Sequence, residues 1–492
     1  MARGALWMVF GKVVDRSLGL VSTLVLARLL VPADFGLIAM ASSLTALLEL
    51  LGAFGVDLNL IRRQDAGADQ YNTAWTLNLL TGLAVAILMV VFALPMSAFY
   101  GEPRLTAVIC VMALASALQG LENVGVVAFR KELRFSRDFT LQVVKKVLGF
   151  AITIPLALLL RNYWALVLGL VGAQATGVVA SYVMHPLRPR LSFAAFHEFF
   201  HFSKWVLMNN LFSVAYNRSS DFVIGRLMGV HALGVFNMAN ELASMPASEL
   251  VAPVNRAVLP VYARVAHDYD ALRREYLFVF GMVSLLAVPA VSGLAAVSPL
   301  VVRVLLGPKW QDTSAVLSIL AFYGLSRVLG SNAYTACVAL GRLKDWFRIT
   351  ILHVLLLVPL LLVLTRSHGL IGAAIAYVVA SMAVLPANIG ITVHMLRIPI
   401  ADMRGVLWRP VVASVAMYVC VRSAMGMTGG GEETASRAIV TLALLVLLGL
   451  VTYAAGVWVM WWMAGRPEGA EVAAVRKALA ESERLIPYRR SA

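Results

Sequence analysis

The sequence predicts an all-α polytopic membrane protein with about fourteen transmembrane helices, arranged as two six-helix lobes in a parallel pseudo-twofold repeat plus a terminal helix pair. Three observations support this fold class. Of the 492 residues, 60% are hydrophobic and only 14% are charged, and the mean hydropathy is +0.82, which is more apolar surface than a soluble domain buries. The apolar residues form runs of roughly 20, enough to cross about 30 Å of hydrocarbon. One segment also recurs 198 residues later.

The apolar runs place the helices in chain order. A first set is expected near residues 5–30, 35–60, 73–100, 103–128, 139–160 and 163–184. A second set follows near 203–226, 232–265, 273–297, 313–340, 347–366 and 369–396, and a terminal pair near 407–425 and 436–463. Three prolines at 246, 253 and 260 predict a kink or an early end in the run 232–265. The expected division is an N-lobe over 1–190, a C-lobe over 191–400, the terminal pair over 401–465 and a cytoplasmic tail over 466–492.

The recurring segment joins the first and second helices of each set. ARLLVPADFGLIAMAS at 27–42 returns as GRLMGVHALGVFNMAN at 225–240, so that Gly36 aligns with Gly234 without a gap. An even number of helices per set means that both copies enter the membrane in the same direction. This is the parallel form of the internal repeats found in transporters.

The loops predict the topology and exclude several functions. Lys and Arg concentrate in alternate loops, which places both termini in the cytoplasm. The remaining loops are short, so we expect no catalytic domain and no enzyme activity. Cys110, Cys337 and Cys420 lie within apolar runs without paired spacing, so no metal site, disulfide or cofactor is expected. The net charge of +15 follows this loop pattern and does not indicate a nucleic-acid partner.

Ionisable residues inside the apolar runs are the candidate site. Such groups are costly in lipid and usually face a bundle interior or an aqueous cavity. Arginine binds phosphate through paired hydrogen bonds and stays charged when desolvated, so the chosen anion-binding residues are Arg16, Arg218, Arg256 and Arg327. Candidate coupling or structural carboxylates are Asp15, Glu49, Asp221, Glu241 and Glu249. The alternative for each arginine is an ion pair that only specifies helix packing, such as Arg16 with Asp15 or Glu49.

Two lysines near the cytoplasmic end of the helix at 139–160 allow two interpretations. Lys145 and Lys146 could meet acidic lipid or a substrate phosphate, but snorkelling to the interface is the favoured interpretation.

Four short motifs resemble those of a known family. They are ARLLVPADFG at 27–36, GVDLNLIR at 55–62, FRKELRF at 129–135 and LGPKW at 306–310. In this order they resemble the polysaccharide transporter family, the Wzx-type flippases of the multidrug/oligosaccharidyl-lipid/polysaccharide exporter superfamily. The resemblance spans most of the chain, although the terminal helix pair matches by hydropathy alone.

The resemblance implies a flippase in the bacterial inner membrane. Its substrate would be an undecaprenyl-pyrophosphate-linked oligosaccharide, moved by alternating access for exopolysaccharide or lipopolysaccharide synthesis. Membrane lipid and the polysaccharide polymerase and export machinery are the implied partners. The alternatives are a cation-coupled multidrug exporter or a lipid-II-type flippase of the same superfamily, and a membrane-bound polymerase or ligase, which would need a large outward loop.

Overall fold

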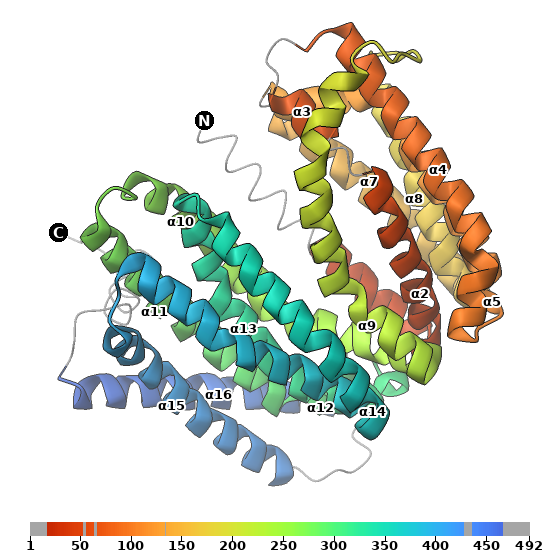
Figure 1. The fold of residues 1–492 in the computed structure, drawn as a ribbon. Coiled ribbons are helices and arrows are strands. Elements are labelled where there is room, and N and C mark those ends of the chain that lie inside the picture. The colour runs from red at the N-terminus through yellow and green to blue at the C-terminus, as the bar shows by residue number, and fades with distance from the viewer. Residues whose placement is uncertain (1–16, 53–55, 63–65, 133, 428–434, 466–492) are drawn as a thin grey trace, which may run out of the picture. The chain divides into compact units, whose positions relative to one another are not determined.

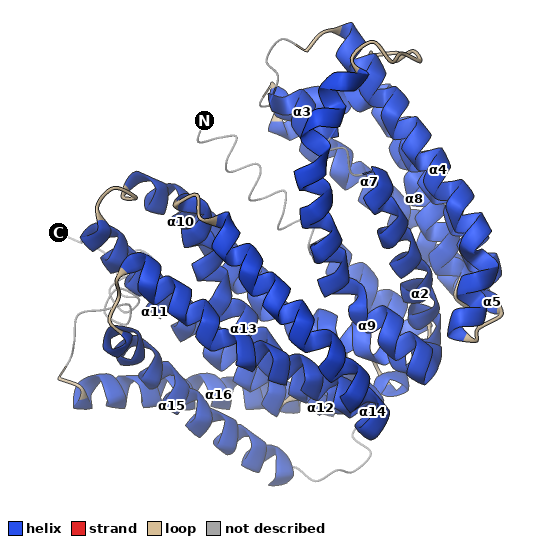
Figure 2. Cartoon of the chain, viewed as in Figure 1, coloured by secondary structure: helices blue, strands red, loops and turns tan. Residues whose placement is uncertain are grey.

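The structure, a computed structural model, describes residues 17–52, 56–62, 66–132, 134–427 and 435–465. Throughout these residues the ordered elements are helices, and no strand occurs among them (Figure 2). Within the described part of the chain, nine helices are long and apolar enough to cross a membrane, and a bent pair at 104–131 makes ten if it is one span. The prediction of an all-helical polytopic membrane protein is therefore confirmed.

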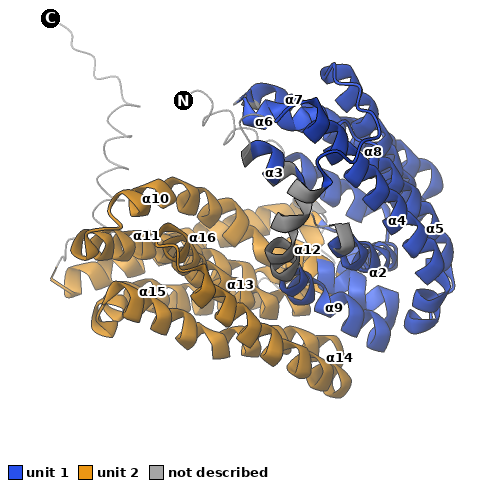
Figure 3. Cartoon of the chain, turned by 45° about the horizontal axis from the view of Figure 1, so that its top comes forward, with its two compact units in different colours: residues 1–237, 306–310 blue, residues 238–305, 311–492 orange. Residues whose placement is uncertain are grey.

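The chain forms two compact units. Unit 1 comprises residues 1–237 and 306–310, and unit 2 comprises residues 238–305 and 311–492 (Figure 3). These units are defined by packing, whereas the expected boundary at residue 190 concerns an internal repeat and stays a prediction.

Unit 1 begins with a helix at Ser17–Leu29. It continues through α2 (Pro32–Leu48), η1 (Glu49–Gly52), α3 (Val56–Arg62), α4 (Ala68–Tyr100), α5 (Arg104–Gly120), η2 (Val124–Val126), α6 (Val127–Lys131), α7 (Phe135–Leu160), α8 (Trp164–Met184) and most of α9 (Phe196–Met245). Helix α5 packs between α4 and α8, and α8 packs on α7 (Figure 1). This arrangement brings polar faces of α4, α5 and α7 toward one interior.

Unit 2 takes up the end of α9 and then a π-helical turn, η3 (Pro246–Val251), at the first of the three prolines. It continues through α10 (Ala252–Arg264), α11 (Tyr269–Ala296), α12 (Ser298–Leu305), α13 (Asp312–Ala339), α14 (Leu343–Leu396), α15 (Ile400–Met427) and α16 (Ala435–Met463), while η4 (Pro308–Trp310) belongs to unit 1. In the interior formed by α10, α11 and α13, Tyr276 stacks on Phe280 and the Tyr262 ring packs against Tyr276 at a tilt. The interior of unit 2 at this place is filled by side chains.

Two helices are about twice as long as a membrane crossing requires. Helix α14 has 54 residues and would be about 80 Å long if it were straight. Gly369 interrupts it with φ 60°, and Gly229 interrupts α9 with φ 80°, a backbone conformation that only glycine adopts without strain. Gly229 falls between the predicted helices 203–226 and 232–265, and Gly369 is the first residue of the predicted helix 369–396.

Candidate functional site

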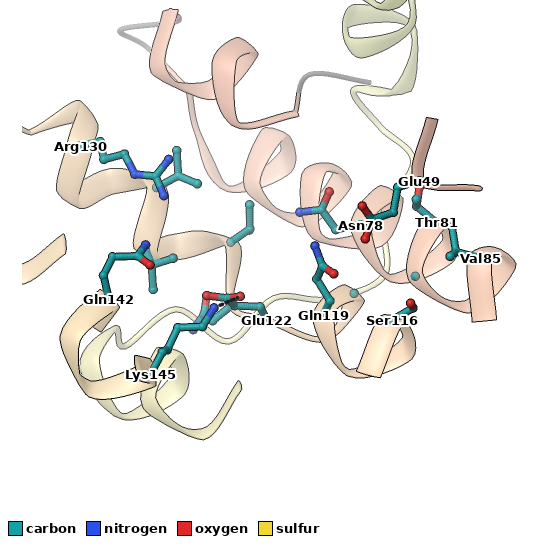
Figure 4. A pocket seen from close by; sticks show the side chains of 16 residues that line it. Glu49, Asn78, Thr81, Val85, Ser116, Gln119, Glu122, Arg130, Gln142 and Lys145 are labelled. Atoms are coloured by element: carbon teal, nitrogen blue, oxygen red, sulfur yellow. Dashed lines mark hydrogen bonds and ion pairs between the residues drawn. The ribbon is translucent and has the colours of Figure 1, made fainter. Parts of the chain in front are cut away.

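Unit 1 contains a polar cavity among its membrane-spanning helices. It consists of two adjoining spaces of about 390 and 460 Å³ that share the lining residues Glu49, Ser116, Gln119, Gln142 and Lys145. We call them together the N-unit cavity. Figure 4 shows the first of these spaces, whose lining side chains come from η1, α4, α5, the segment after α5, α6 and α7. The cavity therefore lies entirely within one compact unit.

The N-unit cavity carries more positive than negative side chains. Its basic lining residues are Arg130, Lys145, Lys146 and Arg218, and its lining carboxylates are Glu49 and Glu122. The other polar groups are mainly amides, contributed by Asn78, Gln119, Asn123, Gln142 and Gln174. Basic groups bind phosphate, and amides exchange hydrogen bonds with hydroxyl groups, so the lining suits an anionic, hydroxyl-rich ligand.

A break in a membrane-spanning helix forms one wall of the cavity. The sequence predicts one helix over 103–128, but α5 ends at Gly120 and the chain resumes at Val124 with a bend of 60°. Asn123 holds the break open, because its Oδ1 accepts from the Gly125 N–H at 2.9 Å and its Nδ2 donates to the Leu187 carbonyl at 2.9 Å. Its own N–H donates to Ser181 Oγ at 3.0 Å. The prediction of one continuous helix was therefore wrong. The sequence pattern of this segment could not predict the break, because the break depends on contacts with residues far along the chain.

Glu122 lies in this break and forms an ion pair across the cavity. Lys145 Nζ of α7 lies 2.9 Å from Glu122 Oε2, and both side chains are about a quarter exposed, at 23% and 24%. A Cβ at Gly177 of α8 would lie 2.5 Å from Lys145 Cε. The missing side chain at Gly177 therefore leaves the space through which the lysine reaches the cavity.

Arg218 borders the cavity from α9. Its Nη1 lies 3.2 Å from Asp221 Oδ2, and the arginine side chain remains 38% exposed while Asp221 is buried. Asp221 Oδ1 also accepts from Asn237 Nδ2 at 3.1 Å. Arg218 thus combines both interpretations that the sequence left open, because it pairs with a carboxylate and lines a cavity.

The structure places the other candidate residues separately. Arg256 is exposed on α10, and Arg327 is exposed on α13, where its guanidinium lies 5.8 Å from the Tyr323 ring centre. Glu241 is exposed near the end of α9, and Glu249 is exposed in η3, where it accepts from Ser248 Oγ at 2.9 Å. These four belong to unit 2.

Arg16 and Asp15 lie outside the described residues. Unit 1 brings together Arg218, Glu49 and Asp221, and the grouping of all four arginines stays a prediction.

The sequence interpretation missed part of the lining. It favoured snorkelling for Lys145 and Lys146, whereas the structure places both side chains on the cavity. It also passed over the amides, of which Gln119 and Gln174 each stand inside an apolar run. An amide at membrane depth is a signal that could have been used, because it needs a hydrogen-bonding partner there.

A bundle of membrane-spanning helices that encloses a polar, net-positive cavity has the architecture of a membrane transporter. The family described as polysaccharide biosynthesis protein matches residues 25–315, and the chain belongs to this family. It is 25% identical to the lipopolysaccharide biosynthesis protein WzxC of Escherichia coli (strain K12), over 77% of this chain and 78% of that protein. It is 23% identical to the teichuronic acid biosynthesis protein TuaB of Bacillus subtilis (strain 168), over 83% of this chain and 85% of that one.

Among solved structures, the fold is similar to that of the lipid II flippase MurJ in its inward closed conformation. The TM-score is 0.75 with 13% sequence identity, and the match covers 94% of this chain and all of that one. At this identity the likeness shows a shared fold. The comparisons confirm the family inferred from the motifs.

Proposed function

We propose that the chain is a flippase that moves an undecaprenyl-pyrophosphate-linked oligosaccharide from the cytoplasmic to the periplasmic leaflet of the bacterial inner membrane. The product would serve exopolysaccharide or lipopolysaccharide synthesis. The observation that carries the proposal is the N-unit cavity, which is net positive and rich in amides within a chain of the polysaccharide biosynthesis family.

Each part of such a substrate has a matching environment. Lys145, Lys146 and Arg218 would bind the pyrophosphate by charge-assisted hydrogen bonds. The amide side chains of Gln119, Gln142 and Gln174 would exchange hydrogen bonds with sugar hydroxyls, and the polyprenyl chain would stay in the bilayer. No bond is made or broken, so the protein needs only to bind, shield and release.

We propose a two-lobe architecture of fourteen helices with both termini cytoplasmic. A Cβ at Gly36 would overlap the Val230 carbonyl oxygen, and a Cβ at Gly234 would overlap the Pro32 carbonyl oxygen. The 198-residue shift that relates the two copies of the recurring segment converts one contact into the other, because Gly36 corresponds to Gly234 and Pro32 corresponds to Val230. This reciprocal crossing supports a repeat, and rocking of the two lobes would give alternating access. Arg16, Arg256 and Arg327 are proposed to complete the head-group site with Arg218.

Complementation tests the proposal. A strain that lacks its own polysaccharide flippase is expected to regain surface polysaccharide when it expresses the wild-type chain. The triple variant Lys145→Gln, Lys146→Gln, Arg218→Gln should reach the membrane in equal amount and lose at least about tenfold in export, because three charge-assisted contacts are gone. Export at the wild-type level by this variant would contradict the assigned cavity. Rescue of peptidoglycan synthesis instead of polysaccharide export would establish the lipid-II alternative.

A further inference from the structure

The ion pair between Glu122 and Lys145 has a setting that differs from an ordinary packing contact. It lies at the wall of the N-unit cavity, and both partners keep about a quarter of their side-chain surface exposed, at 24% and 23%. The dashed line in Figure 4 marks this pair, with Gln119 and Gln142 beside it. A ligand in the cavity would therefore reach the lysine directly.

The two partners are held by different elements. Glu122 belongs to the non-helical break after α5, whose backbone is fixed by the hydrogen bonds of Asn123 to Ser181 and Leu187. Lys145 extends from α7 across the face of Gly177. Because the two charges sit on separate elements, one can lose the other without unfolding of either helix.

We propose that the Glu122 carboxylate pairs with the Lys145 ammonium group when no substrate is bound, and that an anionic group of the substrate displaces this carboxylate and binds Lys145 in its place. This inference rests on the proposed function, because it takes a pyrophosphate-bearing substrate as the competitor. A pyrophosphate offers more negative charge and more acceptor oxygens than one carboxylate, so it competes successfully for the lysine. Arg218 and Lys146 line the same cavity, and the Arg218 side chain stays 38% exposed beside its partner Asp221.

The same exchange explains how the substrate leaves. A cavity with several free cations would hold a pyrophosphate too tightly for rapid release, whereas transport needs binding that is easily reversed. Glu122 returns to Lys145 as the substrate departs, so it lowers the affinity for substrate and assists release. Glu122 is thus a positioning residue that sets affinity without belonging to the attractive part of the site.

The affinity of the purified full-length protein for inorganic pyrophosphate, measured by calorimetry, tests this exchange. Glu122→Gln is expected to bind pyrophosphate about tenfold more tightly than the wild type, because no carboxylate competes. Glu122→Asp, which keeps the charge, should stay within about twofold of the wild type. Lys145→Gln should bind more weakly by about tenfold.

Two matched controls separate exchange from other effects. Glu49→Gln removes an equal charge from the same cavity, and it should tighten binding less than about threefold because Glu49 does not occupy Lys145. Glu102→Gln breaks the ion pair with Arg104, 2.7 Å long and outside the cavity, and should change nothing. Thermal midpoints of all variants report on folding independently of affinity.

Several results would overturn the inference. Unchanged or weaker binding by Glu122→Gln would show a purely structural pair, and an equal gain in Glu49→Gln would show a general charge effect. In both cases pyrophosphate binding by the wild type would leave the proposed function standing. If neither the wild type nor Glu122→Gln binds pyrophosphate, both the inference and the head-group site fail.

Discussion

At the scale of single residues, the cavity depends on a glycine that has no side chain as well as on the side chains that line it. Gly177 carries no side chain where Lys145 crosses α8, and a Cβ there would lie 2.5 Å from Lys145 Cε. A flexible lysine can move away from such a methyl group, so the fold would survive while the ammonium group would shift. The position of one charge is therefore controlled from a neighbouring helix.

Gly177→Ala is expected to displace Lys145 and to lower pyrophosphate affinity roughly three- to tenfold, because a charge-assisted hydrogen bond depends on position. The matched control is Gly405→Ala on α15, where an added Cβ meets nothing within 4 Å. Equal pyrophosphate affinity in both variants, measured by calorimetry, would show that Gly177 does not position the lysine.

His185, which lies outside the membrane-spanning segments, should make the thermal stability of the protein depend on pH. Burial lowers the pKa of His185 below its ordinary 6.5, and its Nδ1 accepts from the Leu187 N–H at 3.2 Å. The neutral ring thus stabilises the fold above that ordinary pKa, and this contribution is lost as the pH falls through the lower pKa of the folded state. Between about pH 7 and pH 5, the thermal midpoint of the wild type should fall further than that of His185→Gln. Parallel curves would refute this assignment.

Residue positions were predictable from the sequence only in part. Depth in an apolar run selected Arg218 and Glu49, which do line the N-unit cavity. The rule that lysines near helix ends reach the interface misjudged Lys145 and Lys146, because the packing of α7 on α8 decides where they point. Such packing joins residues far apart in the chain, and a local pattern does not contain it.

At the scale of elements, the broken span between α5 and α6 is the feature that shapes the cavity. Hydropathy predicted a continuous helix over 103–128, since Leu121, Glu122 and Asn123 do not interrupt the apolar pattern for long. The break is stabilised from outside by Ser181 and Leu187, at the end of α8 and beyond it. Local composition was therefore enough to predict the helices, but it did not predict the break, which depends on contacts with residues outside the segment.

Asn123→Ala should destabilise the broken span, because it removes a buried donor and a buried acceptor together. We expect the free energy of unfolding to fall by about 2 kcal/mol, and pyrophosphate affinity to change as Glu122 moves. Ser181→Ala removes the acceptor of the Asn123 N–H and a hydroxyl bond to the Val178 carbonyl within its own helix, and it should cost about half as much. An Asn123→Ala variant as stable as the wild type in detergent unfolding experiments would show that the break does not depend on this side chain.

At the scale of the whole molecule, the proposed repeat predicts that equivalent positions respond equally. Gly36→Ala and Gly234→Ala would each place a Cβ on a backbone carbonyl of the other copy. Each should lower the free energy of unfolding by about 1 to 3 kcal/mol, because backbone cannot move aside as a side chain can. Gly390→Ala on α14 meets open space and serves as the control. A large effect at one glycine and none at the other, in unfolding experiments, would contradict a symmetric crossing.

At this scale, the class of protein was predictable from the sequence. Composition, run length and the alternation of basic loops are properties of the whole chain, so an error in one helix boundary does not change the class of protein that they predict. The recurring segment aligns Gly36 with Gly234, and in unit 1 each of these glycines lies against the backbone of the other copy. A cavity is instead a product of many packing contacts, and its lining could be predicted only residue by residue.

Transport in proteoliposomes tests the central claim most directly. The full-length protein would be reconstituted with a polyprenyl-pyrophosphate-linked oligosaccharide, and movement of the sugar between leaflets would be followed with a membrane-impermeant lectin. The wild type should flip the lipid, and the triple variant Lys145→Gln, Lys146→Gln, Arg218→Gln should do so at least about tenfold more slowly. Equal rates for the two proteins would contradict a cationic cavity that carries the pyrophosphate.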